Sequence, residues 1–283
     1  MDSGATERQT HDVEFHQYNN SAAIGLQLLS SHAKGLDKTQ SHISTGNKVN
    51  RPKDDAATLA IAQQLLGSFA GTEAVRDGIS RASATVDVAL AAGEATADRL
   101  VDMRGLAVQA SQEGLGQTSR DAINAQFNAL RDQISSINDS ASFGGGNLIA
   151  AGAADQDVLA SEDGARITVG AQDLSAAGMG IDSLALDSAA NASSALAAMD
   201  SAIKDASGKL ANLGSSAATL ETHNELLGVQ NDTLKAGIGE LIDADMAEES
   251  AALVSGQIKQ SLGVISLNIA NAAPGRLVAM IGG

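Results

Sequence analysis

A long run of regularly spaced apolar residues between positions 196 and 241 constrains the fold of this chain most strongly. A repeat of about 3.5 residues keeps one apolar seam of a helix facing a partner as the two helices wind round each other. The segment therefore predicts a coiled-coil helix, and such seams are typical of structural or assembling proteins. The spacing alternates between three and four, apart from the two steps of seven that end at Leu227 and Leu234, at Leu196, Met199, Ile203, Ala206, Leu210, Leu213, Ala217, Leu220, Leu227, Leu234, Ile238 and Leu241.

Two asparagines, Asn224 and Asn231, interrupt this seam. A buried asparagine at such a position fixes the register or the number of partner helices, at some cost in stability. The alternative is that both side chains face solvent where the helix drifts away from its partner. The sequence leaves both interpretations open.

A shorter apolar run, from Ile123 to Ile137, precedes the long seam. It is too short to form a stable helix alone, so it needs a longer helix to pack on. The chain has four Phe, one Tyr and no Trp, and it therefore lacks the large aromatic side chains that usually fill a compact core. Both observations favour a helical rod. Its expected core consists of Ile123, Phe127, Leu130, Ile134, Leu210, Leu213, Leu220 and Leu227.

The charge and composition exclude several classes of function. A formal net charge of −16 argues against nucleic acid or an anionic membrane as a partner, because both attract basic surfaces. The sequence has no apolar run of about eighteen residues, and residues 1–20 are polar, so we expect neither a membrane span nor a Sec-type signal. The chain has no cysteine, and its five histidines form no metal-binding pattern, so we expect no cofactor or metal.

Local signals divide the first half of the chain into helices and linkers. Residues 1–20 are expected to be disordered. A helix then begins at Asn20 or Ser21 and ends near Gly46, and residues 46–53 form a linker that contains Pro52. Asp54 is expected to cap a helix that runs to Ala70, a second helix covers residues 72–112, and Ser119 caps a third.

The second half contains a change of pattern and a final helix. Residues 157–159 and 166–169 are β-prone and flank a Ser-Glu-Asp-Gly turn, which predicts a hairpin. Residues 243–245 cap a last helix, and Pro274 is expected to break it. The two terminal helices carry apolar stripes with nothing local to pack on, at Ile24, Leu28, Leu36, Ile43, Ile258, Leu262, Ile265 and Ile269.

Several motifs resemble those of bacterial flagellins. Residues 42–50 (HISTGNKVN) followed by residues 53–61 (KDDAATLAI) resemble the family's signature. Residues 76–80, 106–110, 141–145, 242–250 and 260–264 are similar to further landmarks in the family's order. The resemblance covers residues 19–272, beginning at Asn19 in the family's start motif. Residues 86–93 (VDVALAAG) are similar to those of short α-proteobacterial flagellins.

The resemblance implies a mainly α fold, an elongated coiled-coil and helical-bundle rod with a small central β-hairpin region. Residues 1–20 would be a disordered N-terminal extension, and residues 21–47 would pair with 245–283 as the terminal coiled coil that lines the filament. Residues 48–142 with 187–244 would form the rod, and residues 143–186 the variable β-containing region. The assembly interface would include Asn19 and the apolar stripes of both terminal helices.

Acidic residues offer the best alternatives to a purely structural protein. Asp54 and Asp55 suit an acid/base pair or a metal site, but their place at a helix start favours capping. A calcium site at Asp155, Asp157, Glu162 and Asp163 is conceivable, although the spacing fits no known loop pattern. The sequence has no zinc-protease, nucleotide-loop or nucleophile-elbow motif, so we expect no enzyme.

The resemblance implies a structural subunit of the extracellular flagellar filament that serves motility and is exported without a cleavable Sec signal. Its implied partners are other flagellin subunits, hook-associated proteins and a flagellin export chaperone at the C-terminal helix. The alternative is a minor or regulatory flagellin homologue, or a hook-filament junction protein, that polymerises poorly. The N-terminal extension, Pro274 and the Gly282-Gly283 end favour this alternative.

Overall fold

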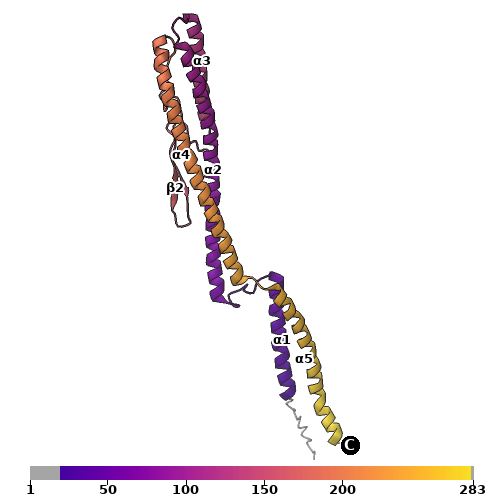
Figure 1. Ribbon diagram of the computed structural model, residues 1–283. Helices are drawn as coiled ribbons and strands as arrows, with labels where there is room; N and C mark the ends of the chain where they lie inside the picture. The colour runs from indigo at the N-terminus through magenta and orange to yellow at the C-terminus, as the bar shows by residue number, and fades with distance from the viewer. Residues whose placement is uncertain (1–19, 282–283) are drawn as a thin grey trace, which may run out of the picture. The chain divides into compact units, whose positions relative to one another are not determined.

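The computed structural model describes the backbone of residues 20–281 and the side chains of Asn20 and residues 22–272. The described chain is mainly α-helical, with one two-stranded sheet (Figure 1). The elements in chain order are α1 (Asn20–Thr45), α2 (Ala56–Ala110), α3 (Gln117–Ser140), β1 (Gln156–Leu159), β2 (Arg166–Val169), α4 (Ala189–Ile242) and α5 (Met246–Ile281).

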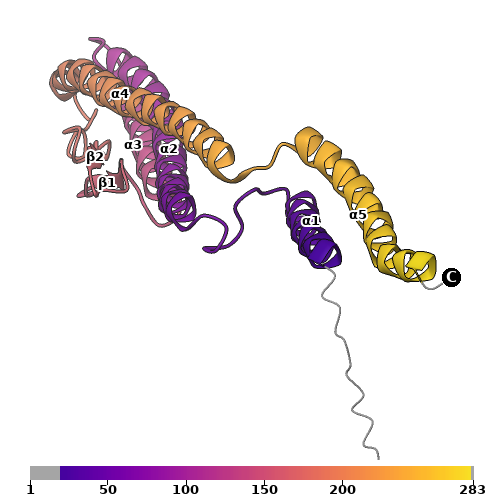
Figure 2. The same ribbon diagram turned by 90° about the horizontal axis from the view of Figure 1, so that it is seen from below.

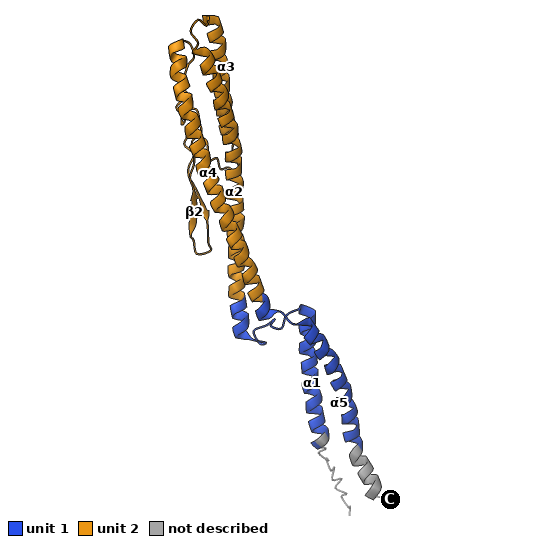
Figure 3. Cartoon of the chain, in the orientation of Figure 1, with its two compact units in different colours: residues 1–62, 239–283 blue, residues 63–238 orange. Residues whose placement is uncertain are grey.

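The chain forms two compact units (Figure 3). Unit 1 comprises the residues up to Ala62 together with those from Gly239 onward, and unit 2 comprises Gln63–Ile238. The division differs in position from the domain boundaries expected from the sequence, which remain a prediction.

In unit 2, α2, α3 and α4 run alongside one another as a bundle, and the hairpin lies beside it (Figure 1 and Figure 2). Residues spaced by seven on α4 are buried, which confirms the coiled-coil character of the long seam. The α3 side chains of Phe127 and Ile134 are fully buried against this core. The buried seven-residue series of α4 consists of Met199, Ala206, Leu213, Leu220 and Leu227.

The hairpin forms where the sequence predicts it. β1 and β2 are antiparallel, with Val158 opposite Ile167. Gly164 closes the turn with a φ of 94°, a conformation that glycine adopts without strain. Two of the four acids considered for calcium hold the hairpin region, because the Asp155 carboxylate accepts a hydrogen bond from the Ala171 N–H at 2.9 Å and Asp157 accepts one from the Thr168 hydroxyl at 2.7 Å. Among the described residues, no group of three or more acids and histidines is placed to hold a metal.

Side chains of the bundle hold the loop between β2 and α4. Arg131 of α3 donates to the backbone oxygens of Asp182 and Leu184 at 2.8 and 3.1 Å. Lys209 of α4 donates to the backbone oxygen of Asp173 at 2.7 Å. Because these donors replace backbone partners that the irregular loop lacks, the loop is fixed to the helices.

Four expectations about helix boundaries are wrong. α2 runs unbroken through Gly71, since a single glycine costs only about 1 kcal/mol in a helix that tertiary packing supports. The N-cap position of α3 is Gly116, without a side-chain hydrogen bond to the first turn. Ser119 lies inside the helix and therefore does not cap it. Asp55 rather than Asp54 caps α2. The helical range of α5 includes Pro274, whereas Pro52 does lie between two helices, as expected.

Candidate assembly surface

The pairing of α1 with α5 organises unit 1. Gly25 lies near Leu267, Leu29 near Gly263 and Leu36 near Gly256. Residue numbers thus increase along α1 as those of their partners on α5 decrease, so the two helices are antiparallel. A carbon placed on Gly256 would lie 2.7 Å from Cδ1 of Leu36, and one on Gly263 would lie 3.1 Å from Cδ1 of Leu29. Leucines of α1 therefore pack onto the glycines of α5, and the helices approach closely.

A polar contact closes this pair near the linker. His42 of α1 is 7% exposed, and its Nδ1 lies 2.6 Å from Oε1 of Glu249 on α5. At the start of α5, the Asp245 carboxylate accepts hydrogen bonds from the N–H groups of Ala247 and Glu248 at 2.8 and 3.2 Å. This cap was expected from the sequence, and it satisfies donors that the first turn of a helix leaves free.

The linker after α1 is a tightly bonded loop. The Lys48 N–H donates to the Ile242 oxygen at 2.7 Å, and the Ala244 N–H donates to the Gly46 oxygen at 2.8 Å. The Asn50 amide nitrogen donates to Oγ1 of Thr45 at 2.7 Å. Hence the motif at residues 42–50 joins the end of α1 to the end of α4 through a fixed backbone path.

The outer side of α5 carries a second apolar stripe, which is largely exposed in the described chain. We call Val254, Ile258, Leu262, Ile265 and Ile269 the outer stripe of α5. Each of these side chains is between 55% and 66% exposed. α5 is thus apolar on two sides, and one of them is covered by α1.

The residues predicted for the assembly interface fall into different environments. Ile24 and Leu28 are exposed on α1, whereas Leu36 lies in the α1–α5 seam and Ile43 is half-buried. The four predicted α5 residues all belong to the exposed outer stripe. Asn19 lies outside the described residues. The sequence reasoning missed Gly256 and Gly263, whose spacing of seven was the available signal.

The residues predicted for the rod core lie on the helices of unit 2. Phe127, Ile134, Leu213, Leu220 and Leu227 are buried, and Ile123, Leu130 and Leu210 are half-buried. These eight residues thus lie within the bundle.

Both seam asparagines face α2. Asn231 is 3% exposed, and its amide nitrogen donates to Oε1 of Glu73, so it does not face solvent. Asn224 is half-buried and accepts a hydrogen bond from Nε of Arg76 at 3.2 Å. Arg76 also pairs with Glu73 at 3.1 Å, which makes one polar network across the α2–α4 seam.

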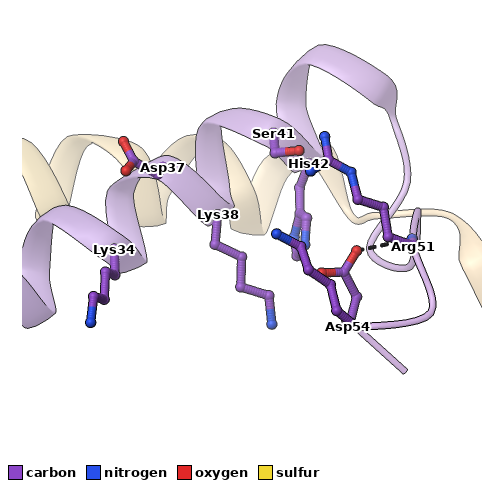
Figure 4. Close-up of a pocket in the computed structure, with 8 residues that line it drawn as sticks. Lys34, Asp37, Lys38, Ser41, His42, Arg51 and Asp54 are labelled. Carbon is purple, nitrogen blue, oxygen red and sulfur yellow. Dashed lines mark hydrogen bonds between the residues drawn. The ribbon is translucent and has the colours of Figure 1, made fainter. Parts of the chain in front are cut away.

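Unit 1 also contains an open pocket of about 590 Å³ on α1 and the loop that follows it. Figure 4 shows Lys34 and Lys38 extending from the same side of α1, with Arg51 and Asp54 of the loop nearby. Lys53 also lines the pocket. We call these four cations, Lys34, Lys38, Arg51 and Lys53, the basic pocket.

Comparisons with known proteins agree across nearly the whole chain. Residues 17–154 match the bacterial flagellin N-terminal helical region, and residues 196–281 match the bacterial flagellin C-terminal helical region. The chain is 38% identical over 263 residues to flagellin FljO of Caulobacter vibrioides, covering 93% of this chain and 96% of that protein. It is 29% identical over 278 residues to a flagellin of Brucella melitensis, covering 94% and 98%.

A solved structure gives the same fold at low identity. A protein from Vibrio parahaemolyticus assigned as a flagellar hook-associated protein has a TM-score of 0.58 and 15% identity, and the match covers 67% of this chain and all of that chain. Within the part of the chain that the structure describes, no helix has the length and apolarity to cross a bilayer. The two matched helical regions and the extended identity show that this chain belongs to the bacterial flagellin family.

Proposed function

We propose that this flagellin, a structural subunit of the flagellar filament, assembles with other copies through the exposed apolar faces of α1 and α5. The outer stripe of α5 is the observation that carries this proposal. Burying apolar surface contributes about 25 cal/mol per Å², so an exposed stripe of five branched side chains favours association. Contiguous exposed apolar surface commonly marks an interaction site.

The two exposed faces differ in sequence, and this difference suits an open assembly. Ile24 and Leu28 supply the face on α1, and the outer stripe supplies the face on α5. Contact between unlike patches of identical copies is head-to-tail, and it generates a helical filament when the rotation does not close. Because α1 and α5 pack against each other, the pair would act in polymerisation as one body.

Replacing Ile258 and Ile265 with serine tests this proposal. Each buried isoleucine contributes about 1.5–3 kcal/mol, and 1.4 kcal/mol corresponds to about tenfold in an equilibrium constant, so we expect the critical concentration to rise by about 100-fold or more. Sedimentation after seeding with sheared filaments measures it, and circular dichroism checks the fold. The matched control replaces Leu226 and Val229, which are exposed on α4, with serine. Equal critical concentrations for both double variants would contradict the proposal.

A second candidate is a specialised subunit that polymerises poorly alone. The helical range of α5 includes Pro274, so the expected helix break does not favour this candidate. Gly282, Gly283 and residues 1–19 lie outside the described residues. The candidate predicts that Pro274→Ala with removal of residues 2–11 lowers the critical concentration of polymerisation. An unchanged and low value would count against it.

The same outer stripe supports proposals about other partners. An export chaperone that binds the C-terminal helix would cover this apolar surface before assembly, and hook-associated proteins would meet it at the filament base. Export would proceed without a cleavable Sec signal, and no catalytic activity is part of the proposal. Isothermal titration of the Ile258→Ser, Ile265→Ser variant with the chaperone measures the contribution of the stripe, and unchanged binding would exclude it as the chaperone site.

A further inference from the structure

The basic pocket is unusual in a chain of this charge. Residues 63–238 contain 22 Asp and Glu but 10 Lys and Arg, whereas residues 34–53 contain five Lys and Arg and one acid. The chain is therefore acidic over unit 2 and basic at one place in unit 1. Surfaces of opposite charge on identical copies attract each other, and like surfaces keep the copies apart.

The four cations of the pocket lack acidic partners. Within residues 20–272, none of Lys34, Lys38, Arg51 and Lys53 lies within ion-pair distance of a carboxylate. The Asp54 carboxylate, which also lines the pocket, is engaged by the backbone N–H groups of Asn50 and Arg51 at 3.3 and 3.1 Å. Asp37 is the other acid at the pocket. Four cations against two acids leave an excess of positive charge in an open hollow.

The pocket is continuous with the face of α1 proposed for assembly. Ile24, Leu28, Ser31, Gly35 and Lys38 follow one another at spacings of four, three, four and three, which places them on one side of the helix. Ile24 and Leu28 are exposed on this side. A copy that covers the apolar part of the face therefore extends toward Lys38 and the pocket.

We propose that the basic pocket receives carboxylates from the acidic unit 2 of a second copy of this chain. The inference rests on the proposed filament function and adds a charged contact to the apolar one. The lysines supply flexible point charges, and Arg51 supplies a planar group that pairs with a carboxylate through two hydrogen bonds. The contact steers copies together and helps to set their register, because apolar association alone is non-directional.

Charge reversal tests the contact. In the variant Lys34→Glu, Lys38→Glu we expect the critical concentration of seeded growth to rise about tenfold at an ionic strength of about 0.01 M. The difference in critical concentration between this variant and the unaltered chain should shrink at an ionic strength of about 1 M, where the Debye length is about 3 Å rather than about 30 Å. The matched control, Lys204→Glu with Lys235→Glu, changes the net charge equally at two exposed lysines of α4. Equal critical concentrations of the two variants at low ionic strength would overturn the inference.

Zero-length cross-linking identifies the partner. A carbodiimide joins a lysine amine to a carboxylate that touches it, and filaments grown from a mixture of isotope-labelled and unlabelled chains distinguish contacts between copies from contacts within one. We expect Lys34, Lys38 or Lys53 to be joined to acids of residues 63–238 of another copy, in filaments and not in free protein. Filaments in which these lysines form only within-chain links, or none, would overturn this inference alone. Failure of the unaltered chain to form filaments would overturn the proposed function and this inference together.

Discussion

Asp55 holds the first turn of α2 through hydrogen bonds to its carboxylate. The hydroxyl of Thr58 donates at 2.6 Å, and the N–H groups of Thr58 and Ala57 donate at 3.0 Å. The Thr58 hydroxyl, followed by these N–H groups, lowers the pKa of Asp55 below its ordinary value of 3.8. Hydrogen bonds to the charged form favour that form, so the folded state binds the proton less tightly than the unfolded state does.

The lowered pKa predicts a pH dependence at the helix start. The stabilisation is complete above the ordinary value of 3.8 and is lost as the pH falls through the lower pKa of the folded state. In NMR spectra the amide resonances of Ala57 and Thr58 should titrate with a midpoint below 3.8, and the variant Asp55→Asn should abolish this step. A midpoint at or above 3.8 would contradict the assigned cap.

The two neighbouring acids show how far sequence reasoning reaches at this scale. An acid at the start of α2 was predictable, because a helix N-terminus attracts negative charge. Asp54 and Asp55 are chemically alike, so the sequence did not decide which of them caps. The loop decides it, since Asp54 is already held by the N–H groups of Asn50 and Arg51.

At the scale of the elements, α2 packs closely against α4 at Gly93. A carbon placed on Gly93 would lie 2.5 Å from Cδ2 of Leu210 and 3.0 Å from Cδ1 of Leu174. The leucine of the long seam thus occupies space that a side chain at position 93 would need. Close packing of this kind tolerates little added volume.

A pair of glycine substitutions in α2 tests this packing. Gly93→Ala should destabilise the chain by about 1–3 kcal/mol because it overpacks the contact. Gly105→Ala in the same helix has no heavy atom within 4 Å of the added carbon, and it should stabilise by about 0.5–1 kcal/mol through helix propensity. Thermal unfolding of both variants gives the comparison, and a stabilised Gly93→Ala variant would show that the contact is loose.

The helices differ in how much of them the sequence revealed. The repeat of α4 is local and long, so the sequence alone predicted a helix over residues 196–241 and its buried side, although α4 begins earlier, at Ala189. The glycine contacts of α5 were not predictable in this way, because they depend on which leucines of α1 lie opposite. The lysines and arginine of the basic pocket come from a helix and a loop, and they meet because the loop is bonded to residues 242–244.

At the scale of the whole molecule, unit 2 contains a core of its own. Buried residues of α2, α3, α4 and the hairpin form one apolar cluster, from Val75 to Leu227. Nothing in this cluster comes from the described part of α1 or α5. The bundle therefore has the packing that independent folding requires.

A fragment of residues 48–244 tests this independence. We expect it to be helical and monomeric, to unfold in a single cooperative transition, and to stay in the supernatant after seeding. The full-length chain, treated identically, is the control. Pelleting of the fragment at the yield of the full chain would place the assembly surfaces in unit 2 and contradict the proposed role of α1 and α5.

The two apolar sides of α5 have a further consequence for the colloidal behaviour of a free copy. Between Ser250 and Ala270 the helix has a single charged residue, Lys259. A free copy therefore exposes a nearly uncharged apolar surface on α5, and the repulsion that keeps copies dispersed comes mainly from the acidic unit 2. Dispersal and adhesion are carried by different parts of one chain, so an isolated α5 peptide would precipitate at concentrations at which the whole protein stays in solution.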